Sequence, residues 1–146
     1  MSVDVQAEVV IARPREVVAG FMFDPKSDRL WMTGFSKVFP MQSGPLVKGA
    51  KVERIGAFLN RQFSAVYFVT DAEEGKFVEM TTDEPFEMKF RYELADEGEG
   101  ATRVRLRIQS FGELRYSLPI PMFKKAVDEK LTEEAKRLKK RLEEGD

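Results

Sequence analysis

The residues best suited to polar chemistry in this chain are two tyrosines that lie within apolar strand patterns. Tyr67 and Tyr92 both fall in phase with apolar neighbours, so both are expected on the inner face of a sheet. A buried phenol requires a hydrogen-bond partner, and the carbonyl or hydroxyl group of a ligand would serve. The alternative is that each phenol bonds a backbone group or reaches the surface.

Three charged residues in strand patterns could support acid catalysis or the binding of an anion. Glu53 or Glu79, if turned into an apolar pocket, would have a raised pKa and would serve as a general acid. Glu79 falls between two apolar positions, so the alternation predicts that it points outward. Around Glu53 the alternation is broken, which indicates a β-bulge. Arg54 would then turn inward and pair with an anionic ligand.

Histidine and cysteine are both absent, and this limits the chemistry more than any residue that is present. A Ser-His-Asp triad and a Cys-His pair are excluded. Disulfides and thiolate metal sites are excluded too, which fits a reducing compartment. Catalysis would have to use a carboxylate, a lysine or a tyrosine. The sequence carries no cofactor motif, so we expect neither a cofactor nor a metal.

Apolar side chains surround these polar candidates in the expected structure. The chain contains 12 Phe, three Tyr and one Trp. Methionine and aromatic side chains suit a hydrophobic ligand of irregular shape, although the same side chains would also fill a solid core. The expected ligand-binding residues are Trp31, Phe63, Tyr67, Met80, Met88, Phe90, Tyr92, Met122, Phe123 and Val127. For Trp31, packing of a helix onto the sheet is the alternative to ligand contact at the pocket mouth.

A series of strands positions most of these residues. The alternating residues 3–12 predict a half-buried strand. Pro14 suits the first turn of a helix, and Asp24-Pro25 begins a second short helix that reaches Trp31 and ends near Gly34. Short connections between the later runs imply antiparallel neighbours. The remaining strands are expected at 35–41, 50–58, 62–70, 76–82, 87–95 and 102–111.

The last quarter of the chain predicts one long amphipathic helix, residues 119–144. Its apolar residues step by three or four and so form one stripe: Ile120, Phe123, Val127, Leu131, Ala135, Leu138 and Leu142. At 1.5 Å per residue, about 24 residues span roughly 36 Å, enough to cross a whole sheet. A single helix held against a curved sheet tends to enclose a cavity. The order of elements predicts an α+β fold.

Composition indicates a single domain, residues 1–146, that can bury a core without staples. The 24 basic and 25 acidic residues are mixed along the chain, which disfavours nucleic-acid binding. No apolar run is long enough for a membrane span. The N-terminus is unlike a signal peptide, so we expect a cytoplasmic protein. The sequence leaves the oligomeric state open.

Two clusters of basic residues have a structural and a functional interpretation. Arg103, Arg105 and Arg107, with basic residues of a neighbouring strand, either alternate with acids of other strands or bind a partner. The basic run at residues 136–141 is interleaved with glutamates at i,i+4 spacing. That spacing favours a solvated helix face over a phosphate-binding patch.

Several short segments match one known family. They are the stretch 9–17 (VVIARPREV), Asp24-Pro25 followed by Trp31, Pro45 with Gly49-Ala50, and Gly100-Ala101-Thr102. With them the chain resembles the START-like (SRPBCC) helix-grip superfamily, which includes the birch-pollen allergens, and within it the polyketide cyclase/dehydrase-like group. The resemblance implies a curved antiparallel sheet of about six or seven strands, two short N-terminal helices and a long C-terminal helix around a cavity.

Members of this superfamily bind lipids, hormones, flavonoids or polyketides, or act as cyclases or chaperone partners, and they share no catalytic motif. The first hypothesis is therefore a non-catalytic module that binds a small hydrophobic or amphipathic molecule, such as a lipid or polyketide, between sheet and helix. A cyclase or dehydratase that uses the same cavity is the alternative, because a templating pocket can act through proximity. A protein-interaction module of the chaperone-partner kind is the third.

Overall fold

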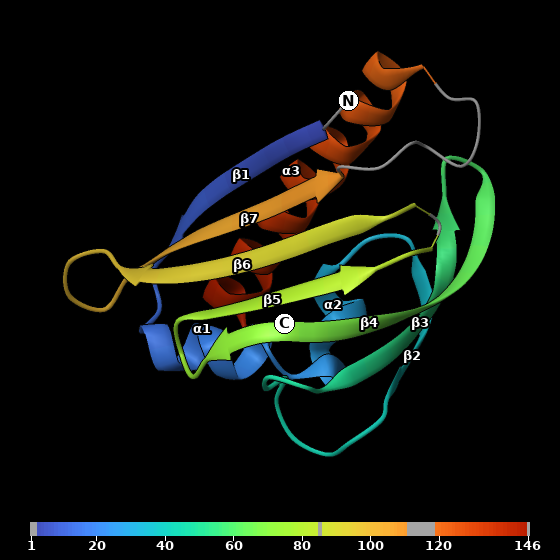
Figure 1. The fold of residues 1–146 in the computed structure, drawn as a ribbon. Coiled ribbons are helices and arrows are strands. Elements are labelled where there is room, and N and C mark those ends of the chain that lie inside the picture. Colours follow the sequence, from blue (N-terminus) through green and yellow to red (C-terminus); the bar gives the residue numbers. More distant parts are fainter. Residues whose placement is uncertain (1–2, 85, 111–118, 146) are drawn as a thin grey trace.

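The computed structural model describes residues 3–84, 86–110 and 119–145 (Figure 1). Residue 111, the last of the strand expected at 102–111, lies outside these ranges. In chain order the elements are β1 (Val3–Ile11), α1 (Arg15–Met22), a 3₁₀ turn η1 (Pro25–Ser27), α2 (Asp28–Trp31), β2 (Phe35–Pro40), β3 (Lys51–Phe58), β4 (Arg61–Glu73), β5 (Phe77–Thr82), β6 (Met88–Asp96), β7 (Thr102–Ser110) and α3 (Ile120–Glu144).

The seven strands form one antiparallel sheet in the order β1-β7-β6-β5-β4-β3-β2. The first two strands of the chain are therefore the two edges of the sheet. All three helices lie behind the sheet in Figure 1, with α3 running behind β1 and β7. The expected α+β helix-grip architecture is confirmed.

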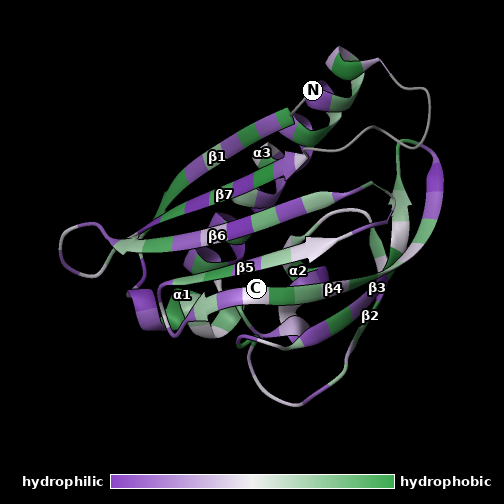
Figure 2. Ribbon diagram, viewed as in Figure 1, coloured by the Kyte–Doolittle hydropathy of each residue, from purple (hydrophilic) through white to green (hydrophobic). Residues whose placement is uncertain are grey.

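Strict alternation explains why one sheet face holds the core. Along β6 the side chains of Met88, Phe90, Tyr92 and Leu94 are buried, and the charged residues between them face outward. Figure 2 shows the same alternation of hydrophobic and hydrophilic residues along β1, β6 and β7. An antiparallel sheet with one solvated face has this pattern.

The helix α3 begins after Pro119 and ends at Glu144, and the following Gly145 has a φ of 80°, the left-handed conformation that glycine favours after a helix. Its buried residues include the whole expected stripe from Phe123 to Leu142. One charged residue, Glu134, is buried with them. A carboxylate in a helix face that packs on the core requires partners.

The prediction of a β-bulge around Glu53 is wrong. β3 pairs with β4 without interruption from Lys51 to Phe58. The irregular positions lie in β2, between Phe35 and Lys37, and in β4, between Val69 and Asp71. Arg54 points inward in ordinary strand alternation.

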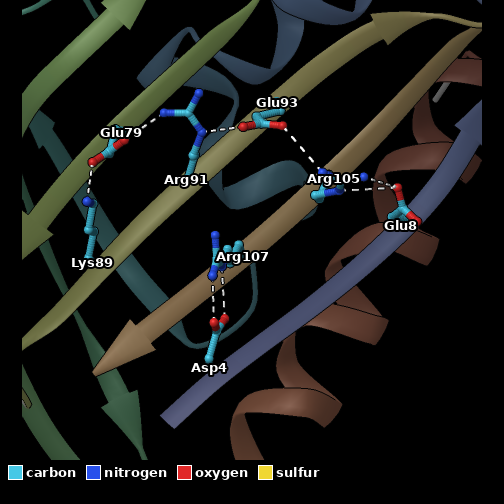
Figure 3. A network of polar contacts seen from close by, with 8 residues as sticks. All are labelled: Asp4, Glu8, Glu79, Lys89, Arg91, Glu93, Arg105 and Arg107. Carbon is cyan, nitrogen blue, oxygen red and sulfur yellow. Dashed lines mark hydrogen bonds and ion pairs between the residues drawn. The ribbon is translucent and has the colours of Figure 1, made fainter. Parts of the chain in front are cut away.

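Ion pairs cover the outer face of β1, β5, β6 and β7 (Figure 3). Arg107 binds Asp4 at 2.6 Å and Arg105 binds Glu8 at 3.1 Å. Glu79 accepts hydrogen bonds from Lys89 and Arg91 at 2.6 and 2.7 Å, so its expected outward orientation is confirmed. Acidic residues therefore alternate with the arginines, as the first of the two sequence interpretations expects.

Candidate functional site

A half-open cavity of about 400 Å³ lies between the sheet and the middle of α3. This volume is within the range of pockets that hold drug-sized molecules. Most of its wall is apolar and aromatic, while charged side chains of α3 stand on one side. The lining residues are Thr33, Gly34, Phe35, Ala57, Phe58, Leu59, Phe63, Tyr67, Met88, Phe90, Ile108, Ala126, Val127, Glu129, Lys130 and Glu133.

The structure places half of the expected ligand-binding residues in this wall: Phe63, Tyr67, Met88, Phe90 and Val127. Four others are buried but do not line the cavity: Trp31, Met80, Tyr92 and Phe123. Met122 departs from the expectation that it closes the cavity, because its side chain is 52% exposed and does not line it. It immediately precedes Phe123, which occupies the inward position on this turn of α3.

Aromatic rings close one side of the cavity. Phe58 is in the wall, and its ring centroid lies 6.0 Å from those of Phe86 and Phe123. The Phe86 and Phe123 rings pack edge to face at 4.8 Å. Such pairs contribute beyond the area that they bury. Phe123 therefore supports the wall from behind.

A carboxylate of α3 holds the segment that leads into β2 at the cavity mouth. Oε2 of Glu134 accepts hydrogen bonds from the Thr33 backbone N–H at 2.9 Å and from Lys130 Nζ at 2.6 Å. Lys130 Nζ also donates to the Thr33 carbonyl at 2.8 Å and lies 4.8 Å from the centre of the Phe35 ring. These contacts fix Thr33 and Phe35 against the helix.

A fully buried ion pair lies beside the cavity. Arg54 on β3 donates from Nε and from one terminal nitrogen to Oδ2 of Asp28 on α2, at 3.0 and 2.7 Å. Asp28 and Arg54 are 0% and 1% exposed. The guanidinium also lies 4.6 Å from the centre of the Tyr67 ring, an arrangement in which the ring face attracts the cation.

Burial shifts the pKa values of this group. Desolvation raises the pKa of Asp28, and the positive charge of Arg54 offsets this only in part. Burial alone would lower the pKa of Arg54, but the Asp28 carboxylate raises it. Desolvation also raises the pKa of Tyr67 and of Tyr92. Both phenols therefore stay protonated at neutral pH, where they act as hydrogen-bonding groups and not as bases.

Several polar atoms in this region have no partner. Asp28 Oδ1, Trp31 Nε1 and Glu134 Oε1 are buried without a hydrogen bond. Tyr67 and Tyr92 bring two phenol groups to the same region, and both side chains are almost fully buried. We call these five residues together with Arg54 the buried polar cluster. Buried polar atoms without partners are rare in folded proteins.

Sequence reasoning missed Asp28 and Glu134. A signal for Glu134 exists, because it follows Leu131 by three positions and precedes Leu138 by four, the spacing of the apolar stripe. Asp28 precedes Trp31 by three positions, which places both on one side of α2. Neither spacing reveals the long-range partners, because Arg54 lies 26 residues from Asp28 and Thr33 lies 101 residues from Glu134.

Neither a metal site nor a membrane-spanning helix is found in the described part of the chain. No group of three or more acidic residues there is arranged to hold a metal ion. None of the helices described combines the length and the apolar character needed to cross a membrane.

Comparisons with known proteins give the fold. No family model matches the chain, and no curated protein does. Solved structures match it over nearly the full length of both chains. A START superfamily protein from Mycobacterium smegmatis has a TM-score of 0.82 at 17% identity, covering 98% of this chain and 99% of that one. Major latex-like protein 151 from Panax ginseng has a TM-score of 0.73 at 11% identity, covering 97% of each.

A third solved structure that matches the chain belongs to a differently named protein. Aha1 from Colwellia psychrerythraea, solved as a dimer, has a TM-score of 0.68 at 17% identity, covering 99% of this chain and 98% of that one. At these identities the likeness concerns the fold alone. The chain has the START-like helix-grip fold.

Proposed function

We propose that this protein binds a small hydrophobic or amphipathic molecule in the cavity between its sheet and α3. The observation that carries the proposal is the wall itself: an aromatic and aliphatic surface that stays half open to solvent and is not filled by side chains. Burial of a ligand's apolar area would drive binding, at about 0.8 kcal/mol for each buried methylene group. Ordering of the ligand and of the wall offsets part of this gain.

The first test is native mass spectrometry of the protein purified from its own host. A reproducible stoichiometric adduct of small-molecule size supports the proposal, and denaturing extraction then identifies the ligand. The matched variants are Ala126→Phe, which fills the cavity from α3, and Met122→Phe, which adds a ring on the exposed side of the same helix. The adduct should be lost in Ala126→Phe and kept in Met122→Phe. Equal occupancy of both variants would overturn the proposal.

A cyclase or dehydratase is the second candidate, and the buried carboxyl groups of Asp28 and Glu134 favour it. A desolvated acid near a ligand can move a proton. Both acids, however, are already bound to cationic side chains, Arg54 and Lys130. Turnover of a reactive polyketide chain that is lost in Asp28→Asn, with ligand binding retained, would establish this candidate.

The protein-interaction module has less support. Its candidate surface was the row of arginines on β7, and Arg103, Arg105 and Arg107 are each paired with a carboxylate. An outer face with balanced charges gives a partner little long-range attraction.

A further inference from the structure

The buried polar cluster has unused hydrogen-bonding capacity of both kinds. Asp28 Oδ1 and Glu134 Oε1 are free acceptors, and the Trp31 indole N–H is a free donor. The hydroxyls of Tyr67 and Tyr92 can donate and accept. All five side chains are at least nine-tenths buried. Leaving the three free atoms of Asp28, Trp31 and Glu134 unpaired is unfavourable, so the cluster has capacity for a further polar group.

The parts of the cluster lie together. Trp31 and Tyr92 pack with ring centroids 5.6 Å apart, and the Phe90 ring packs with both tyrosines, 6.5 Å from Tyr92 and 5.4 Å from Tyr67. Glu134 interacts electrostatically with both tyrosines. Elements distant in the sequence, α2, β3, β4, β6 and α3, thus bring their polar atoms to one region of the core.

The charge of this region decides which polar group fits. The carboxylates of Asp28 and Glu134 are matched by the cations of Arg54 and Lys130, so the four side chains sum to zero. A further anion would add an unpaired charge beside two free carboxylate oxygens, and an uncompensated buried charge is costly. A neutral group that both donates and accepts adds no charge and can satisfy either a free acceptor or the free donor of the cluster.

Two residues connect this region to the cavity. Tyr67 lines the cavity and has the Arg54 guanidinium against its ring. Lys130 also lines the cavity and binds Glu134. Tyr67 is the cluster residue that lines the cavity, so a polar group at the inner end of a bound ligand meets the cluster at Tyr67, with Lys130 beside it. The free atoms of Asp28, Trp31 and Glu134 do not line the cavity themselves, and the head group reaches them only by passing this layer.

We propose that the buried polar cluster is the head-group subsite of the cavity and selects a neutral hydroxyl or primary amide over a carboxylate. This inference rests on the proposed function, because it requires the ligand's apolar part to occupy the cavity. It adds a chemical class: a neutral amphipathic molecule with one hydrogen-bonding head, and not a fatty-acid anion.

The test compares three probes with the same chain: decan-1-ol, decanoate at pH 8 and decyl methyl ether. Binding is measured by isothermal titration calorimetry. Trp31 is the single tryptophan, so its fluorescence reports independently whether the head group reaches the cluster. We expect all three probes to bind. The alcohol should bind at least about tenfold more tightly than the carboxylate, because a site built around buried polar groups discriminates against a ligand that leaves them unpaired.

Two variants separate this subsite from simple burial. Trp31→Phe keeps an aromatic ring and removes the free N–H, so the advantage of alcohol over ether should shrink. Glu134→Gln removes one negative charge and leaves Lys130 and Arg54 facing Asp28 alone, so decanoate should gain relative to decan-1-ol. Asp128→Asn makes the same charge change at an exposed position of α3 outside the cavity wall and should not alter the ratio. Binding of the ether reports that each variant keeps a folded cavity.

The two proposals fail in different ways. If no probe binds the wild type, both are overturned. If the three probes bind with equal affinity, and neither Trp31→Phe nor Glu134→Gln changes their ratios, the cluster holds buried water only. The head-group subsite is then wrong, while ligand binding in the cavity stands.

Discussion

At the residue scale, the ion pair between Asp28 and Arg54 is the most unusual feature of this core. Moving both charges out of water is expensive, and their attraction repays the cost only with good geometry. Here two nitrogens of Arg54 reach one oxygen of Asp28, and the ring of Tyr67 covers the guanidinium. The pair adds little net stability, but either charge alone would be left buried without compensation.

Removing one partner should therefore cost far more than removing both. We expect Arg54→Met to lower the free energy of unfolding by about 3–5 kcal/mol, because Asp28 is then an unpaired buried charge. The double variant Arg54→Met with Asp28→Asn should lose less than the sum of the two single variants. Urea unfolding monitored by circular dichroism gives all the values of this cycle.

The control for this cycle is Arg105→Met, which removes an arginine of an exposed ion pair with Glu8 on the outer sheet face. Exposed pairs contribute about 0.2–1 kcal/mol, so this variant should be close to the wild type. An Arg54→Met variant as stable as Arg105→Met would show that the buried pair does not hold the core.

At the element scale, the mouth of the cavity depends on a close approach between β3 and the segment before β2. Gly34 has a φ of 88°, and its carbonyl accepts a hydrogen bond from the Ala57 N–H at 2.9 Å. A Cβ atom on Gly56 would lie 2.0 Å from that carbonyl oxygen. Only glycine at position 56 lets the two backbones meet there.

Gly56→Ala should push these backbones apart. Overpacking of this kind typically costs about 1–3 kcal/mol, and the movement should also widen the mouth at Gly34 and Ala57. Gly20→Ala is the matched control, because a Cβ atom there has nothing within 4 Å and the residue lies inside α1. Alanine in a helix interior should stabilise by up to about 1 kcal/mol. Thermal denaturation of both variants measures the contrast, and a Gly56→Ala variant as stable as Gly20→Ala would contradict it.

The pairing of β5 with β6 should make part of the stability depend on pH. Burial acts to raise the pKa of Glu79, but the hydrogen bonds and charges of Lys89 and Arg91 lower it below its ordinary value of 4.5. A carboxyl whose pKa is lowered on folding stabilises the fold above its unfolded pKa, and this contribution is lost as the pH falls through the folded pKa.

The melting temperature of Glu79→Gln should therefore lie below that of the wild type at pH 7. The difference should shrink as the pH falls below about 4.5 and Glu79 takes up a proton in both states. Melting curves of both proteins between pH 7 and pH 2 test this. A difference that does not change with pH would mean that the side chain acts through packing and not through its charge.

The strands and α3 were predictable because their patterns are local. The alternation in β6 and the three-or-four spacing in α3 are properties of consecutive residues. β3 was misinterpreted because its outward Ile55 is apolar and its inward Arg54 is charged, which inverts the usual pattern. Lys130 stands four positions before Glu134 on α3, but the Thr33 N–H that binds Glu134 and the Asp28 carboxylate that binds Arg54 come from other elements, so no local spacing identifies those contacts. The buried polar cluster becomes visible only in three dimensions.

At the scale of the whole molecule, α3 lies with α1 and α2 on one face of the seven-stranded sheet, and space remains between the sheet and the middle of α3. α3 contacts β1 along much of its length, and it contacts α2. Opposite β3 and β4 the cavity separates the helix from the sheet, and the Phe35, Phe63 and Tyr67 rings line that space. The pair of sheet and helix is thus packed on one side and open on the other.

This asymmetry predicts that a ligand stabilises the molecule and that the effect is local. A ligand present at a hundredfold excess over its Kd raises the free energy of unfolding by about 2.7 kcal/mol. For a domain of this size each kcal/mol raises the melting temperature by roughly 2–4 °C.

Hydrogen exchange should slow at residues 33–35 and 57–59 and in the middle of α3, which line the cavity. It should change little in the ladder between β1 and β7, which lies outside the wall except for Ile108. Ala126→Phe, with the cavity filled, should lose both effects. Protection spread evenly over all seven strands would instead indicate a ligand bound elsewhere.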